Sequence, residues 1–165
     1  MLTQLSTRRE DGNQDLVDLL GECHQRIRRF IDLARRAASQ PDAPPDQVAQ
    51  ACADVERYFV EALPLHVADE EESIEPRLRG LSPSVDLALD AMAQQHREHA
   101  SKLEALLRAT VRVRREPHDE RARGELATAA IALETEFEGH LALEENTIFP
   151  AIRELLSPET QESII

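Results

Sequence analysis

Long apolar runs, glycine and aromatic residues are all scarce in this sequence of 165 residues. No uninterrupted apolar stretch approaches the ~20 residues of a membrane-spanning helix, so an integral membrane protein is not expected. Glycine occurs only five times, and β-branched residues are scattered and not gathered into short alternating runs, which argues against a sheet. The first fifteen residues, MLTQLSTRREDGNQD, lack the apolar core of a secretory signal. We therefore expect a soluble, cytoplasmic protein.

Basic residues are also in the minority, with 19 against 32 acidic ones and a net charge of -13. Such a chain repels nucleic acids and anionic membranes, so neither is expected as a partner. The two cysteines, Cys23 and Cys52, lie on separate predicted helices. A disulfide is not expected in a reducing cytosol, and both are interpreted as small buried residues.

Helix-favouring residues dominate the rest of the chain. Three segments rich in proline, glycine or polar residues predict loops, and Ser82 before Pro83 predicts a helix start. They leave helical segments at roughly 15–38, 46–78, 83–114 and 120–156. Short loops between four helices predict an all-α, antiparallel up-down-up-down bundle. This domain would span 15–156, between a polar N-terminal arm (1–14) and a C-terminal tail (157–165) that ends in two exposed isoleucines.

One segment of the sequence occurs twice. HVADEEESIEPRL, from His66, recurs as HLALEENTIFPAI, from His140, with six of thirteen positions identical, which indicates an internal duplication. Each copy carries a histidine and, four residues later, a glutamate: Glu70 and Glu144. At about 100° per residue, positions i and i+4 of a helix lie on the same face, one turn apart. Both side chains of a pair can then reach one metal ion.

Polar residues interrupt the apolar stripe of every predicted helix, at positions where a leucine would be expected. An unpaired buried carboxylate costs several kcal/mol, and buried imidazoles need partners. A compensating cation explains all of these positions together, although each residue alone could be a satisfied polar group of the core. The interrupting residues are His24, His66, Glu70, His96, His140 and Glu144.

The spacing of the histidines predicts a dinuclear site. His24 precedes His66 by 42 residues, and His96 precedes His140 by 44, so the repeated unit is a pair of helices. Two such pairs around a pseudo-twofold axis bring four histidines and two glutamates into one layer. In the simplest arrangement each metal takes two histidines, while Glu70, Glu144 and a solvent oxygen bridge the ions. These ligands favour iron or manganese over zinc, and leave about one position per metal for a small ligand.

This pattern resembles the hemerythrin-like, or HHE cation-binding, family. The matching residues are His24 in LLGECHQRI, His96 in QQHREH and the two segments that begin at His66 and His140, and they cover about 15–156. The resemblance implies a four-helix bundle that holds two irons per chain in a non-haem di-iron centre, with manganese or zinc ranked behind iron. Oxygen carriers of the family place a second histidine on the third helix where this sequence has Ala100. The pattern is closer to bacterial members linked to iron handling, nitric oxide or peroxide responses, and sensing.

Several neighbouring residues have open roles. His99 is either a fifth ligand or a histidine beside the site, and Tyr58 either reaches the site or is an aromatic residue at the edge of the core. The acids that flank the predicted ligands are interpreted as a solvated helix face, with a metal entry path as the alternative; they are Asp69, Glu71, Glu72 and Glu145. Pro64 removes a backbone donor within the second helix and predicts a kink or bulge at 60–63.

Three functions fit the residues. The favoured one is a di-iron protein that binds or senses O₂, NO or a related small oxidant, or takes part in iron handling. The alternative is a di-iron enzyme with oxidase, peroxidase or NO-reducing activity. A third is a structural bundle stapled by zinc or another cation, or an iron store. The expected ligand is a small diatomic molecule or a peroxide, and a homo-oligomer or a protein partner stays open.

Overall fold

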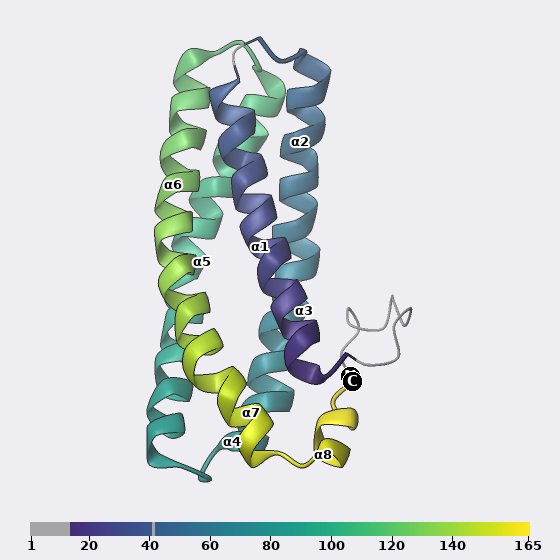
Figure 1. Cartoon of the computed structure of the whole chain (residues 1–165). Coiled ribbons are helices and arrows are strands. Elements are labelled where there is room, and N and C mark those ends of the chain that lie inside the picture. The colour runs from purple at the N-terminus through teal and green to yellow at the C-terminus, as the bar shows by residue number, and fades with distance from the viewer. Residues whose placement is uncertain (1–13, 41) are drawn as a thin grey trace.

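The computed structural model describes residues 14–40 and 42–165. Within these residues every regular element is a helix, so the all-α prediction is confirmed. Figure 1 shows long helical segments lying side by side. In the described part of the chain, no helix combines the length and the hydropathy needed to cross a lipid bilayer.

The described residues form four long helical segments and one short final helix. The first segment is α1 (Leu16–Ser39), and the third is α5 (Pro83–Arg115). The second is continuous from residue 45 to 78 and contains α2 (Pro45–Arg57), η2 (Tyr58–Ala62), α3 (Leu63–Ala68), η3 (Asp69–Ile74) and α4 (Glu75–Leu78). The fourth contains α6 (Glu120–Leu143), η4 (Glu144–Ile148) and α7 (Phe149–Leu155), and α8 (Pro158–Glu162) follows it. Each predicted segment therefore begins and ends within one residue of the observed one.

The helix starts use the caps that the sequence offers. Asp15 accepts a hydrogen bond from the backbone N–H of Asp18, whose side chain accepts one from Asp15 in return, and this capping box begins α1. Ser82 stands at the N-cap of α5 before Pro83, as predicted, although its hydroxyl contacts the hydroxyl of Ser84 and not a backbone N–H. Gly80 makes the tight turn before α5 possible, because its φ of 83° lies in the left-handed region.

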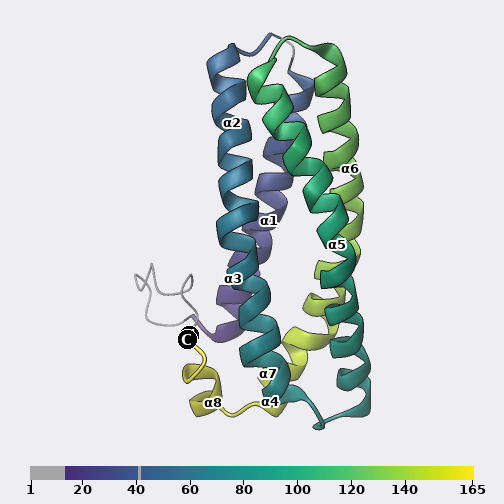
Figure 2. The ribbon, with the colours of Figure 1, turned by 180° about the vertical axis from the view of Figure 1, so that it is seen from behind.

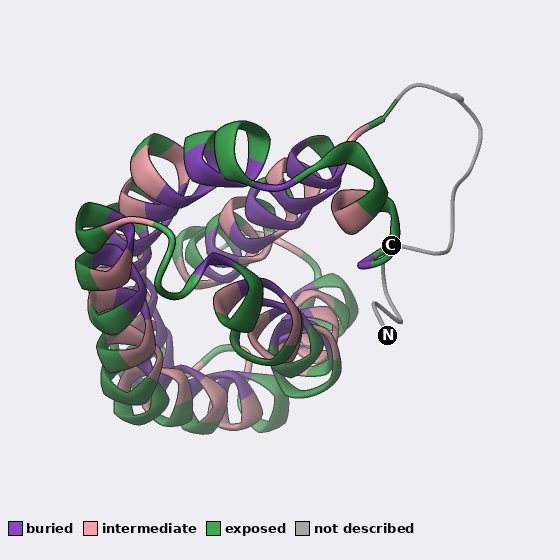
Figure 3. Ribbon diagram, turned by 90° about the horizontal axis from the view of Figure 1, so that it is seen from below, coloured by how far each residue is buried: buried purple, intermediate pink, exposed green. Residues whose placement is uncertain are grey.

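The four long segments pack in a closed arrangement. α1 packs against α2 and α6, and α5 packs against the same two helices from the opposite side. Figure 2 shows this opposite side, with α5 in front of the bundle. Seen from below, buried residues line the inward faces of the segments while exposed ones face outward (Figure 3).

The core consists of two apolar clusters, which a polar layer separates. The lower cluster in the view of Figure 1 includes Leu16, Leu20, Ile74, Leu78, Leu89, Met92, Ile148 and Ile152. The upper cluster includes Ile27, Ile31, Val55, Leu63, Leu106, Leu126, Leu133, Phe137 and Leu141. Along every long segment, the predicted ligands lie between the residues of one cluster and those of the other. Cys23 lies in the lower cluster and Cys52 in the upper one, and both are buried as predicted.

The C-terminal residues fold back onto the bundle. Gln161 donates hydrogen bonds from Nε2 to the carbonyls of Ile152 and Leu156, and Ile164 is buried in the lower cluster. The expectation of two exposed isoleucines was therefore wrong for Ile164 and right for Ile165. Burial against the start of α1 was missed because the contact joins opposite ends of the chain. The predicted N-terminal arm lies outside the described residues except for Gln14.

The three η segments are π-helical, and each ends two residues before a proline. The backbone N–H of Leu63 donates to the carbonyl of Tyr58, five residues earlier, directly before Pro64. The kink or bulge predicted at 60–63 is therefore confirmed. The same bond joins Glu75 to Glu70 before Pro76, and Phe149 to Glu144 before Pro150. A proline cannot donate the normal helical bond and collides with the carbonyl four residues earlier, and a wider turn relieves both problems.

Candidate metal centre

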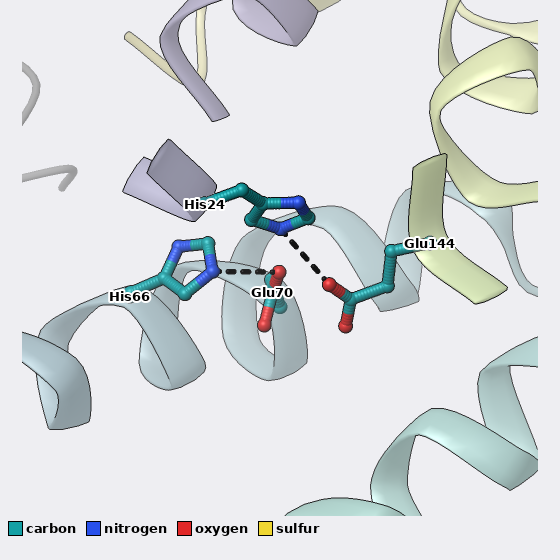
Figure 4. A group of neighbouring side chains, drawn as sticks. All are labelled: His24, His66, Glu70 and Glu144. Atoms are coloured by element: carbon teal, nitrogen blue, oxygen red, sulfur yellow. Dashed lines mark ion pairs between the residues drawn. The ribbon is translucent and has the colours of Figure 1, made fainter. Parts of the chain in front are cut away.

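The polar layer contains two groups of possible metal ligands. The first group consists of His24, His66, Glu70 and Glu144, and the second of Glu70, His96, His140 and Glu144. Within each group, one ligand atom from every residue lies within 4.8 Å of all the others. All six residues predicted from the sequence are therefore brought together, and the two glutamates are common to both groups. Figure 4 shows the first group, in which Glu144 reaches across from η4 to His24 on α1.

Each shared carboxylate directs one oxygen to each group. For Glu70, Oε1 lies 3.2 Å from Nε2 of His66, and Oε2 lies 3.3 Å from Nε2 of His96. For Glu144, Oε2 lies 3.0 Å from Nε2 of His24, and Oε1 lies 3.1 Å from Nε2 of His140. This is the arrangement that a carboxylate needs in order to bridge two cations.

The unsatisfied atoms of the layer fit a metal. Nε2 of His24, both ring nitrogens of His66, Oε2 of Glu70 and both oxygens of Glu144 are buried and have no hydrogen-bond partner among the described residues. Such orphan atoms are rare in proteins because each costs about 1–3 kcal/mol or more. Two ligand atoms at about 2.1 Å from one ion and at right angles lie about 3 Å apart, close to the separations found here. The donor set therefore fits cations that prefer nitrogen and oxygen ligands.

The π-helical segments η3 and η4 begin at, or one residue before, the two glutamates that both groups share. Glu70 follows Asp69 at the start of η3, and Glu144 is the first residue of η4. The carbonyl of each glutamate accepts the wide bond that closes the segment before the next proline. π-helical turns often occur at functional sites, since they change the direction of side chains within an otherwise regular helix. The signal for them was present in the sequence as a proline six residues after each glutamate.

The outer ring nitrogens of three histidines have polar partners. Nδ1 of His24 lies 2.9 Å from Oε1 of Glu145, and Nδ1 of His96 lies 2.8 Å from Oε1 of Glu71. Nδ1 of His140 lies 2.9 Å from Oε1 of Gln95. A partner on the outer nitrogen fixes the ring so that Nε2 faces the metal. Of the acids interpreted as a solvated helix face, Asp69 is buried, so the interpretation was wrong for that residue. Glu71 is exposed and Glu145 is half-buried, and each also contacts a histidine of the layer. The match of Glu71 with Glu145 across the repeat was the available signal for these contacts.

Arg28 forms a salt bridge with Glu145, one of the two glutamates that contact Nδ1 of a histidine. Its Nη1 lies 2.8 Å from Oε1 of Glu145, and its Nη2 lies 3.2 Å from Oε2 of the same residue. Such two-point pairs fix geometry as well as charge. This role of Arg28 was not predicted from the sequence.

A cavity of about 30 Å³ borders the second group. Its wall combines four imidazoles with apolar side chains; they are His66, His96, His99, His140, Ile27, Leu63, Val67, Leu103 and Phe137. The volume is close to that of one water molecule in the liquid. A very small molecule therefore fits beside the candidate metal ligands.

His99 belongs to this cavity and to neither group of ligands. Its ring stacks on Phe137 at 4.4 Å and meets the ring of His140 edge-on at 4.7 Å. Its Nε2 is buried and has no hydrogen-bond partner in the part of the chain that the structure describes. Burial, with the nearby charge of His96, lowers the pKa of His99 to about 4, so its imidazole is neutral at pH 7. Tyr58 stacks on Phe30 at 4.2 Å, does not line the cavity and matches the expected core-edge aromatic.

Comparison with known proteins assigns the family. The model of the hemerythrin HHE cation-binding domain matches residues 15–152. The chain belongs to the hemerythrin HHE cation-binding family. Among curated proteins, no significant match is found. This HHE domain therefore has the fold of a cation-binding family, and its buried layer contains the His and Glu groups that could hold the cation.

Two histidines of this HHE domain are neutral in the metal-free state. Burial lowers the pKa of His66 to about 3 and that of His140 to about 2. A metal ligand must be deprotonated, and these two imidazoles meet that condition at any pH near neutrality.

The pKa values of the other two histidines of the HHE domain are raised. Burial opposes protonation of His96, but contacts with Glu70 and Glu71 outweigh burial and raise its pKa to about 9. Burial also opposes protonation of His24, whose pKa is nevertheless raised by Glu144. Burial and the adjacent charge of Glu144 raise the pKa of Glu70 to about 7. The carboxylates thus favour the protonated forms of these two imidazoles, and His96 carries a positive charge next to them at pH 7.

Proposed function

We propose that this HHE domain binds two iron ions, one per group of ligands, bridged by Glu70 and Glu144. The supporting observation is the direction of the carboxylate oxygens, since each glutamate offers one oxygen to the histidines of each group. Two imidazoles and two shared carboxylates per ion suit iron better than zinc, which prefers four-coordinate sites and thiolate or imidazole ligands. Manganese fits the same ligands, and metal analysis of the purified protein separates the two.

We further propose that the task of the centre is to bind or sense a small oxidant such as O₂ or NO. When bound, a pair of irons supplies redox chemistry and open positions for a small molecule. The protein contributes the cavity of about 30 Å³, which lies against three of the predicted ligands and is otherwise largely apolar. Its size excludes larger substrates, and its apolar wall suits a small, weakly polar molecule.

Spectroscopy tests this proposal. Reduced, iron-loaded protein exposed to O₂ or to an NO donor should develop new visible absorption bands, and the bands should reverse or change on re-reduction. A protein that contains two irons and gives no new bands with either gas would contradict the binding role.

The enzyme alternative is favoured by one observation. His99 lines the cavity and its Nε2 has no hydrogen-bond partner among the described residues, so its neutral imidazole can donate a hydrogen bond there. A di-iron oxidase, peroxidase or NO-reducing enzyme needs such a donor. Turnover of H₂O₂ or NO by the loaded protein, compared with the same concentration of free iron, decides between turnover and binding.

A further inference from the structure

The two halves of the metal centre differ outside the ligands themselves. The repeat matches His24 with His96, His66 with His140, and the outer acid Glu71 with Glu145. The ligand atoms of the two halves are equivalent under this match. The residues that contact Nδ1, the ring nitrogen that points away from the other ligands, differ between the two halves.

In the first group, the hydrogen bond at the outer ring nitrogen, Nδ1, is shared with a cation for His24 and absent among the described residues for His66. Glu145 accepts the hydrogen bond of His24, but Arg28 binds both of its oxygens and neutralises part of its charge. Nδ1 of His66 has no hydrogen-bond partner among the described residues. Arg28 stands four residues after His24, and the matching position after His96 is the exposed Ala100.

In the second group, both histidines have an acceptor and no cation competes for it. Glu71 accepts the hydrogen bond of His96, and within the described residues it forms no ion pair with an arginine or a lysine. Gln95 accepts from Nδ1 of His140. The residue that matches Gln95 in the first half is Cys23, which stands directly before His24 and does not supply such an acceptor to His66.

From these contacts we propose that the two metal positions are unequal, and that the position of His96 and His140 holds its ion more tightly than the position of His24 and His66. The proposal rests on the proposed function, since it concerns the same pair of irons.

The reason is electrostatic and geometric. An outer carboxylate orients an imidazole and makes it a stronger donor to the metal, and loss of such a contact commonly costs about 10–100-fold in metal affinity. The carboxylate of Glu71 acts with its full charge, whereas that of Glu145 is shared with a guanidinium. The positive charge of Arg28 also opposes a cation at the nearer position. Both effects favour the second group, so its ion binds about 10-fold more tightly or better.

An anaerobic titration with ⁵⁷Fe²⁺ tests the proposal. One equivalent should bind at least about 10-fold more tightly than the second, and the Mössbauer spectrum should show one quadrupole doublet at one equivalent and two distinct doublets at two. Uptake of two ions with one affinity and superposed doublets would overturn the inference and leave the proposed function standing. Failure to take up iron at all would overturn both.

Two conservative variants show which metal position is filled in each of the two iron-binding steps. In Glu71→Gln the amide oxygen still accepts from His96 but carries no charge, so the tight step should weaken by about 10-fold and the first doublet should shift. Glu145→Gln should weaken the other step and shift the other doublet. A purely structural role would lower the melting temperature without moving a single doublet. If both variants affect the same step, the assignment of the outer acids is wrong.

Arg28→Ala tests the cause of the inequality. Removal of the guanidinium restores the full charge of Glu145 and removes a positive charge near the weak position, so the two affinities should approach each other. Arg35→Ala is the matched control, because Arg35 lies on the same helix and pairs with exposed Glu134 away from the centre. An unchanged ratio of the two affinities in Arg28→Ala would contradict the proposal.

Discussion

Glu145 and His24 stand 121 positions apart in the sequence, yet Oε1 of the glutamate lies 2.9 Å from Nδ1 of the histidine. This contact joins the second copy of the repeat to the first helix. Its counterpart, between Glu71 and His96, joins the first copy to the third helix. Each copy therefore supplies a histidine to one half of the centre and a glutamate to both halves, and it contacts a histidine of the other half.

Loss of one bridging carboxylate should empty both positions. In Glu144→Gln, the amide keeps the shape of the side chain but removes the charge that both ions share, so we expect the iron content to fall from two per chain to below one. Glu72→Gln is the matched control, because Glu72 lies on η3 but is exposed. Metal analysis of both variants after reconstitution measures the effect. Two irons per chain in Glu144→Gln would show that Glu144 is not a bridge.

Metal affinity should depend on pH through the histidines. At pH 7 the metal-free protein carries a proton on His96, whose contacts with Glu70 and Glu71 raise its pKa to about 9 against the effect of burial, and the pKa values of His24 and Glu70 are raised as well. Binding must displace the proton of His96, so at least about one proton should be released per chain at pH 7 and the apparent affinity should rise between pH 7 and 9. A weakly buffered solution with a pH indicator measures the release.

The same linkage predicts loss of metal in acid. Protons compete first for His24 and His96, whose pKa values are raised, and we expect the metal to dissociate as the pH falls below about 6. Dialysis at stepped pH followed by metal analysis gives the midpoint. Full retention of metal at pH 4 would contradict ligation by histidine.

Removal of the metal should lower the stability of the bundle without unfolding it. A ligand at 100 times its dissociation constant adds about 2.7 kcal/mol per site, which corresponds to about 5–10 °C in melting temperature for a domain of this size. The two apolar clusters remain on either side of the layer, so helical circular dichroism at 25 °C should survive chelation. Complete loss of helix on chelation, with no response to redox agents, would favour the structural staple instead.

Filling the cavity should slow ligand entry and leave the metal in place. Leu103 lines the cavity and is not a predicted metal ligand, so Leu103→Phe should reduce the rate of NO or azide binding by about 10-fold at an unchanged iron content. Stopped-flow absorbance measures the rate. Overpacking costs about 1–3 kcal/mol, and Leu103→Val controls for a general loss of packing because it enlarges the cavity. Equal rates in both variants would mean that the ligand does not use this cavity.

Most of the helix positions could be predicted because they depend on local signals. Apolar periodicity and the loops rich in proline or glycine predicted the start and end of each helical segment to within one residue of those observed. Pro64 predicted a bulge where the structure has the π-helical segment η2. The predicted ligands lie together because the repeat and the helical period both place them on the inner faces. Each of these signals can be read from a short stretch of sequence or from a comparison of two such stretches.

The missed features depend on contacts between distant segments. Arg28 and Glu145 form their pair across two helices, and nothing near Arg28 in sequence distinguishes it from an ordinary surface arginine. Ile164 is buried in the lower cluster, which combines residues from the start of α1 with residues from other segments. The position of His99 was also open, since its spacing from His96 allowed either a ligand or a cavity residue until the packing against Phe137 was known.

The most direct test of the account is the amount of iron that the folded protein binds under anaerobic conditions. The shared carboxylates of Glu70 and Glu144 predict two ferrous ions per chain, released together when either glutamate is replaced by glutamine. One ion per chain, or two ions that persist in both variants, would contradict a centre bridged by these residues.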